Sequence, residues 1–214
     1  MLYKIDIYGR IIPKLTHLLG MTFRHLLIAA ICSGSVMQAT AQEPAAPAAA
    51  PAQQYENWEQ FSPQVRAALL FILAAGFESM ATVEERQIAK TSVEAHILFL
   101  EEVIKLNPSF ITGRDREYFD TLISINIARM EALKALPPTA TDRDFAEVRE
   151  RHAAELKKAK AQYGYANVDA ISMKQLDVMQ QKYMQQCIAA DPTSPAKIFR
   201  LFAEKLREES ISQY

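Results

Sequence analysis

The chain has 214 residues, of which 50% are apolar and 23% charged, with 24 Lys and Arg against 25 Asp and Glu. This globular composition excludes a chain disordered over most of its length, a collagen-like or disulfide-rich protein, and a protein with many membrane spans. A net charge of −1 gives no electrostatic reason to expect a nucleic acid as the partner.

Residues 21–41 have the pattern of a secretory signal peptide. A short basic segment, 21–25, precedes the compact apolar run 26–32, and Ala39-Thr-Ala41 supplies small residues at the cleavage positions. We expect cleavage before Gln42 and an exported protein, periplasmic or extracellular. The apolar run is too short to span a bilayer, and we expect no transmembrane helix in the mature chain. A core helix or a retained anchor is the alternative for this segment.

The segments on either side of the predicted signal are expected to lie outside the folded domain. Residues 1–20 are either a long basic n-region or untranslated sequence before a true start at Met21, and the second is favoured because Met21 begins a signal of ordinary length. Residues 42–54 are rich in Ala and Pro and contain no large apolar residue, which predicts an extended linker. The folded domain is therefore expected over residues 55–214. From Gln42 onward the chain has 20 basic against 24 acidic residues.

Proline and glycine positions divide residues 55–214 into segments of helical length. No Asn-Gly or Asp-Gly hairpin signal occurs, and apolar residues recur at intervals of three and four rather than two. We predict an all-α fold, a compact antiparallel bundle of about six helices. The expected helices are 63–75, 82–106, 113–136, 141–163, 172–190 and 195–206.

Several helix ends are predicted from local signals. Pro63 follows a serine, as at the first position of a helix, and Gly76 is the expected end of that helix. Thr82 and Glu85 have the spacing of a capping box, which predicts a new helix there. Gly164 is expected to cap its helix in the left-handed conformation. A tetratricopeptide array is the alternative architecture, but the expected small and aromatic repeat positions are absent.

The residues that carry chemistry are sparse. After the signal the chain has two histidines, His96 and His152, and neither has the paired spacing that places two metal ligands on one helix face. His152 lies on an apolar stripe and is interpreted as a core histidine. No nucleophile elbow and no glycine-rich phosphate loop occurs. We therefore expect no catalytic residue, no metal and no cofactor, and favour a non-enzymatic protein.

Cys187 is the single cysteine after the signal, so no intramolecular disulfide is available there. It lies on an apolar helix face, which favours a buried, inert thiol. The alternative is an intermolecular disulfide, because an odd cysteine in an exported protein can pair between chains. A homo-oligomer is one consequence of that alternative.

Two features carry the functional hypotheses. Tyr55, Trp58 and Phe61 lie between linker and bundle, and they either latch the N-terminus onto the core or form an aromatic patch for a partner. The apolar segments 67–77 and 97–100 either pack closely or line a cavity of lipid size.

The leading hypothesis is an exported, non-enzymatic bundle that binds a protein or another macromolecule of the cell envelope, and no nucleic acid. The second hypothesis is a periplasmic carrier or chaperone for apolar ligands, with its cavity between the first two helices. The third is an enzyme whose site assembles from distant residues such as His152.

Overall fold

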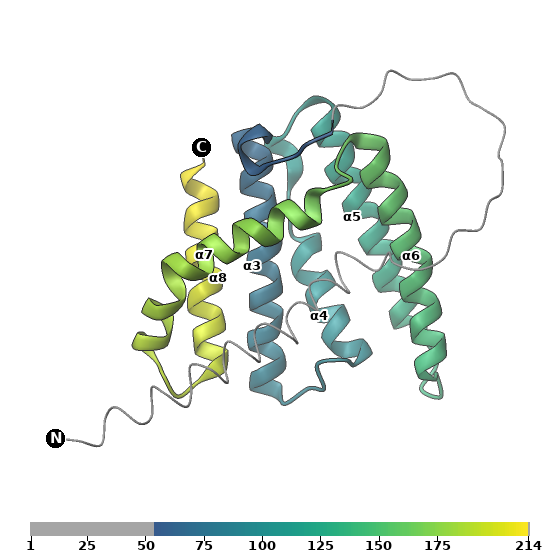
Figure 1. The fold of residues 1–214 in the computed structure, drawn as a ribbon. Helices are drawn as coiled ribbons and strands as arrows, with labels where there is room; N and C mark the ends of the chain where they lie inside the picture. The colour runs from purple at the N-terminus through teal and green to yellow at the C-terminus, as the bar shows by residue number, and fades with distance from the viewer. Residues whose placement is uncertain (1–53, 214) are drawn as a thin grey trace.

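The computed structural model describes residues 54–213, and every regular element in that range is helical (Figure 1). This confirms the predicted all-α class and a bundle of six α-helices. The predicted signal peptide, residues 21–41, and nearly all of the predicted linker, residues 42–54, lie outside the described residues. The helices are α3 (Pro63–Arg86), α4 (Val93–Ile104), α5 (Gly113–Lys134), α6 (Asp142–Tyr163), α7 (Val168–Ala190) and α8 (Pro195–Ser212), with two 3-10 turns, η2 (Trp58–Gln60) and η3 (Pro108–Phe110).

The first long helix, α3, runs through Gly76 instead of ending there, so the predicted end was wrong. Ala75 and Phe77 on either side of this glycine are fully buried. An interior glycine costs about 1 kcal/mol relative to alanine, and the burial of α3 against several neighbours outweighs that cost. The helix ends at Gln87, which takes the left-handed conformation with φ 54°.

The predicted helix start at Thr82 was also wrong, because Thr82 lies inside α3. Its hydroxyl donates to the carbonyl of Glu78 at 3.2 Å, a bond to the preceding turn of the same helix. The next helix, α4, begins after Ser92, whose hydroxyl accepts from the backbone N–H of Ala95 at 3.2 Å. A serine cap later in the chain thus performs the role that the sequence pattern gave to Thr82.

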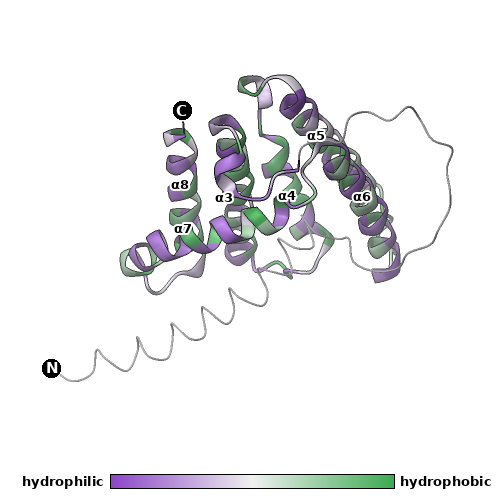
Figure 2. Ribbon diagram, turned by 45° about the horizontal axis from the view of Figure 1, so that its top comes forward, coloured by the Kyte–Doolittle hydropathy of each residue, from purple (hydrophilic) through white to green (hydrophobic). Residues whose placement is uncertain are grey.

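Helix α3 is the centre of the bundle. It packs against α4 on one side and α8 on another, and it contributes to both clusters of buried hydrophobic residues. By length and composition alone α3 is apolar enough to cross a membrane, but 72% of its most apolar window is buried inside the bundle. That burial is what a core helix shows. Figure 2 shows green and purple stripes along α8, as in a helix that buries one side.

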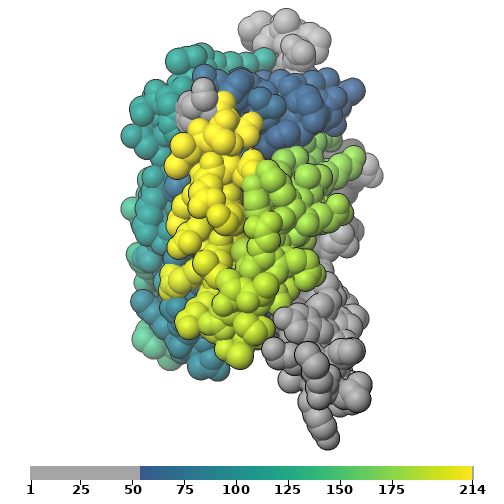
Figure 3. Space-filling view, turned by 90° about the vertical axis from the view of Figure 1, so that its left-hand side faces the viewer, coloured from purple at the N-terminus to yellow at the C-terminus, as the bar shows by residue number. Residues whose placement is uncertain are grey.

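Helix α7 lies across the bundle, whereas α3, α5, α6 and α8 run more nearly along it (Figures 1 and 2). Beyond its first turns it packs beside α8, and η2 lies against it at the top of the same face (Figure 3). The first turns of α7 pack elsewhere: Val168 belongs to the cluster of buried residues that includes α4, α5 and α6, and Ser172 lines the cavity between these helices and α3. By crossing the bundle, α7 closes an apolar cavity between itself and α3 to α6.

Candidate functional site

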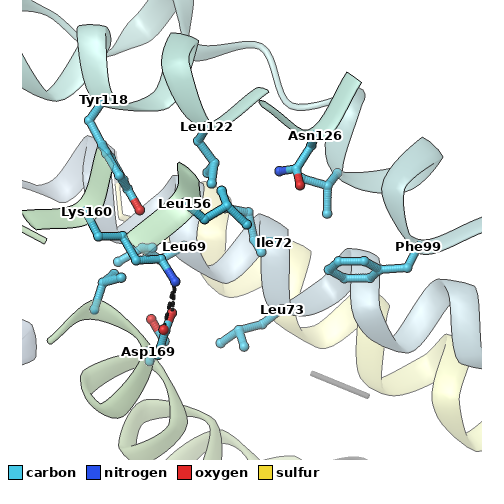
Figure 4. A pocket seen from close by; sticks show the side chains of 13 residues that line it. Leu69, Ile72, Leu73, Phe99, Tyr118, Leu122, Asn126, Leu156, Lys160 and Asp169 are labelled. Atoms are coloured by element: carbon cyan, nitrogen blue, oxygen red, sulfur yellow. Dashed lines mark hydrogen bonds and ion pairs between the residues drawn. The ribbon is translucent and has the colours of Figure 1, made fainter. Parts of the chain in front are cut away.

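An apolar cavity of about 40 Å³ lies where α7 crosses the bundle (Figure 4). All five helices from α3 to α7 contribute to its wall. The segments 67–77 and 97–100 both take part, through Leu69, Ile72 and Phe99. Its size suits a small apolar group or the end of a chain, since one water needs about 10–15 Å³ by this kind of measure.

Sequence reasoning missed the contribution of α5, α6 and α7 to this wall. Leu122 of α5 and Leu156 of α6 complete the apolar surface, and Asn126 places a buried amide at one end (Figure 4). Periodicity shows that such residues face inward, but it does not show which helices meet around a gap.

A buried ion pair lies at the opposite end of the cavity. Lys160 is 7% exposed, and its Nζ donates to the Oδ1 and Oδ2 of Asp169 at 2.8 and 2.7 Å. The Tyr118 hydroxyl points toward the same end (Figure 4). Burial, followed by the charge of Asp169, raises the pKa of Tyr118, so this hydroxyl stays protonated and able to donate. The cavity thus has apolar walls with polar groups at both ends.

Lys160 follows Lys157 and Lys158 in the densest cluster of basic residues in the sequence. The structure buries Lys160 alone of the three, one turn after Leu156 on the apolar stripe of α6. That four-residue spacing was the signal available in the sequence.

The structure brings Tyr55, Trp58 and Phe61 together at the N-terminal edge of the core. Phe61 is 2% exposed and stacks on Tyr165 with ring centroids 5.8 Å apart, and Trp58 meets Phe61 edge-on at 6.0 Å. The hydroxyls of Tyr55 and Tyr165 both donate to Oδ1 of Asp115, at 3.1 and 2.7 Å. These contacts hold the N-terminal segment against the core, and we call Tyr55, Trp58 and Phe61 the N-terminal latch. A partner contact there stays a prediction, with Trp58 half-buried and Tyr55 partly exposed.

Cys187 lies on α7 against the cluster shared with α3 and α8, and it is 3% exposed. Burial raises the pKa of its thiol, which lowers the thiolate fraction. An intermolecular disulfide stays a prediction, and it requires α7 to move away from its neighbours first.

The two histidines lie on different helices and are both buried. His152 Nδ1 lies 3.0 Å from the carbonyl of Val148, in the position of a core histidine with a backbone partner. His96 Nδ1 lies 3.1 Å from the carbonyl of Ser92. Within residues 54–213 no group of three or more His, Cys, Asp or Glu side chains is arranged to hold a metal ion.

Comparison with protein-family models, with curated proteins and with solved structures finds no match to this chain.

Proposed function

We propose that this protein is a carrier that binds a small apolar ligand, or the apolar end of a larger one, in the cavity between α3 and α7. The observation that supports the proposal is the wall itself, which is apolar over most of its surface and has Asn126 at one end and the Lys160–Asp169 pair at the other. Ligand sites commonly combine an apolar wall with a few polar groups that orient the ligand.

The surface gives less support to binding through a large apolar patch. Among the described residues, the large hydrophobic side chains that are well exposed are Phe110, Val178 and Ile211, which lie on η3, α7 and α8. Single exposed hydrophobic residues on separate elements are ordinary features of a protein surface. Binding to an envelope macromolecule remains a prediction, with Tyr55, Trp58 and Phe61 as its candidate contacts.

The proposed place of action is outside the cytoplasm, because residues 21–41 have the pattern of a signal peptide and residues 42–54 that of a tether. N-terminal sequencing of protein from its natural source tests this part. A mature chain that begins at Gln42 is expected, and a chain that retains the leader in the cytosol would contradict it.

The cavity is tested with 1-octanol and a pair of adjacent variants on α5. Leu122→Phe places a larger side chain in the cavity, whereas Ile123→Phe adds the same bulk at a half-buried position outside the cavity wall. Octanol is expected to raise the stability of wild type and Ile123→Phe, by about 2.7 kcal/mol at one hundred times its Kd. Leu122→Phe should lose this effect.

The measurement is the thermal midpoint, followed by circular dichroism, over a series of octanol concentrations up to its solubility. No rise in the wild-type midpoint, or an equal rise in Leu122→Phe, would overturn the proposal. Because both variants are scored by the shift that octanol causes, a lower starting stability in either one leaves the comparison valid.

A further inference from the structure

A second group of polar side chains lies in a buried corner between α4, α5 and α6, outside the cavity wall. His96 of α4, Arg129 of α5 and Arg149 of α6 lie close enough there for their charges to interact, and the ring of Phe145 lies between His96 and Arg149. The His96 ring lies edge-on to the Phe145 ring at 4.9 Å, and the Cζ of Arg149 lies 5.9 Å from its centroid. Arg129 is 1% exposed.

Two side chains of this corner, Arg129 and His96, have buried nitrogen atoms without the partners that buried polar groups normally have. Nε and Nη2 of Arg129 and Nε2 of His96 are buried without a hydrogen-bond partner. Neither Arg129 nor Arg149 makes an ion pair within 4.0 Å with an acidic side chain of the described chain. Burial first and then the charge of Arg149 lower the pKa of Arg129 to about 10.

A buried guanidinium without a counter-charge is strongly unfavourable, because it has lost its hydration and gained nothing in return. Arg129 stays charged at neutral pH even with its lowered pKa, and Arg149 adds a second positive charge beside it. An anion that enters this corner therefore relieves an existing electrostatic cost. The planar fork of a guanidinium matches the oxygen pairs of carboxylate, sulfate and phosphate groups.

We propose that the corner formed by His96, Arg129 and Arg149 is a binding site for an oxyanion. Arg149 is half-exposed, so the anion approaches from its side, while the buried donors of Arg129 lie deeper. His96 Nδ1–H donates to the Ser92 carbonyl, which leaves Nε2 to face the anion as a second donor once the ring is protonated.

The oxyanion has two potential sources, a free inorganic anion or the acid group of a ligand held in the cavity. Arg129 lies one turn beyond Asn126 on α5, and His96 lies one turn before Phe99 on α4, so the corner adjoins the Asn126 end of the cavity. The second source rests on the proposed function, whereas the first stands without it.

The test for a free anion compares sodium sulfate with sodium chloride at equal ionic strength, using the thermal midpoint of the full chain. Sulfate also stabilises proteins without binding, so the difference between variants carries the result. Arg149→Gln removes a half-exposed charge from the corner. Arg143→Gln is its control, because Arg143 is an exposed arginine of the same helix that pairs with Glu147 at the surface. Sulfate should stabilise wild type and Arg143→Gln equally, and Arg149→Gln less, with at least a tenfold weaker apparent Kd.

The test for an anionic ligand compares octanoate with octanol. At least a tenfold preference for octanoate, lost in Arg149→Gln and retained in Arg143→Gln, assigns the oxyanion to the cavity ligand. A sulfate effect without this preference assigns it to a free anion. If neither effect appears, the site is refuted. If octanol fails to bind while sulfate binds, the proposed function fails and the oxyanion site stands.

Two further measurements separate anion binding from a merely structural role. Arg129→Met keeps the length of the side chain and removes the unpaired charge, so without sulfate it should be at least as stable as wild type, and it should lose the specific sulfate effect. In NMR titrations the pKa of His96 should rise when sulfate binds, since an adjacent negative charge favours the imidazolium that Arg129 and Arg149 oppose. An unchanged His96 titration at saturating sulfate would contradict the proposal.

Discussion

Asp115 is expected to hold the N-terminal latch in place, and its removal tests that role. Its Oδ1 accepts from the hydroxyl of Tyr165 at 2.7 Å and from that of Tyr55 at 3.1 Å. Tyr165 is fully buried, and its ring stacks on Tyr118 of the cavity wall with centroids 4.0 Å apart. The carboxylate therefore supports both the latch and one side of the cavity.

The magnitude follows from the two bonds. Asp115→Ala leaves the buried Tyr165 hydroxyl without its acceptor, which costs about 1.5–3 kcal/mol for a bond to a charged group. The bond from the partly exposed Tyr55 adds about 0.5–1 kcal/mol, because water replaces the lost acceptor there. We expect a total loss of about 2–4 kcal/mol. Tyr165→Phe removes one donor and leaves the half-buried Asp115 accessible to water, so it should cost only about 0.5–1.5 kcal/mol.

The assay is urea unfolding, followed in parallel by circular dichroism and by the fluorescence of Trp58, the single tryptophan of the chain. Trp58 contacts Phe61 of the latch, so its emission reports the region that Asp115 holds. The double variant Asp115→Ala with Tyr165→Phe should be less destabilised than the sum of the singles. Asp115→Ala within about 0.5 kcal/mol of wild type, or strict additivity, would refute the reasoning.

Three further outcomes are expected. Burial lowers the pKa of His96, so below the ordinary histidine pKa of about 6.5 the unfolded chain takes up a proton that the folded chain resists. Without added oxyanion, the free energy of unfolding, measured with urea at each pH, should therefore fall from pH 7 to pH 5. The same measurement on His96→Asn should show a smaller fall. Phe202→Ala should cost about 3–5 kcal/mol, because this fully buried ring packs against Phe77 at 4.6 Å, and a loss below 1 kcal/mol in the same assay would argue against tight packing there. In the chain from Gln42, Cys187 should react with a thiol reagent only in urea, and rapid labelling of the native protein would place the thiol at the surface.

The helix ends that were predicted well have strong local chemistry. Pro63 and Pro195 each begin a helix behind a serine whose hydroxyl caps it, and Gly164 ends α6 with φ 88°. Thr141 and Asp144 form a capping box at the start of α6. At these positions a few neighbouring residues decide the backbone conformation, so the sequence alone was sufficient.

The predictions failed where tertiary packing outweighs a local preference. Gly76 weakens a helix in isolation, yet α3 continues through it because its surroundings are buried on several sides. Likewise, α8 continues to Ser212, beyond the expected end of this helix at residue 206. The hydroxyl of Ser210 is buried there and donates to the carbonyl of Ala67 at 2.8 Å. Contacts between residues so distant in sequence leave no periodic or capping signal.

The cavity was half predicted, and the charged corner was missed. Apolar segments on α3 and α4 pointed to a space beside them, but the crossing of α7 that closes it depends on the whole arrangement of helices. Arg129 lies toward the C-terminal end of α5, where the helix macrodipole favours a cation even on an exposed face, so its position in the sequence does not indicate burial. Its burial is a result of packing between α4, α5 and α6, which no spacing along α5 indicates.

The buried polar groups are divided unevenly between the two sides of α3, and this division supports a separation of roles. On the side of α8, the buried Ser210 is neutral, and its hydroxyl donates to the carbonyl of Ala67 of α3 at 2.8 Å. Among α4, α5 and α6, Arg129 retains buried donors without partners, and Lys160 requires Asp169 as its counter-ion. Because uncompensated buried charge lowers stability, its position beside the cavity agrees with the proposed binding region, while the side facing α8 is packed mainly with apolar side chains.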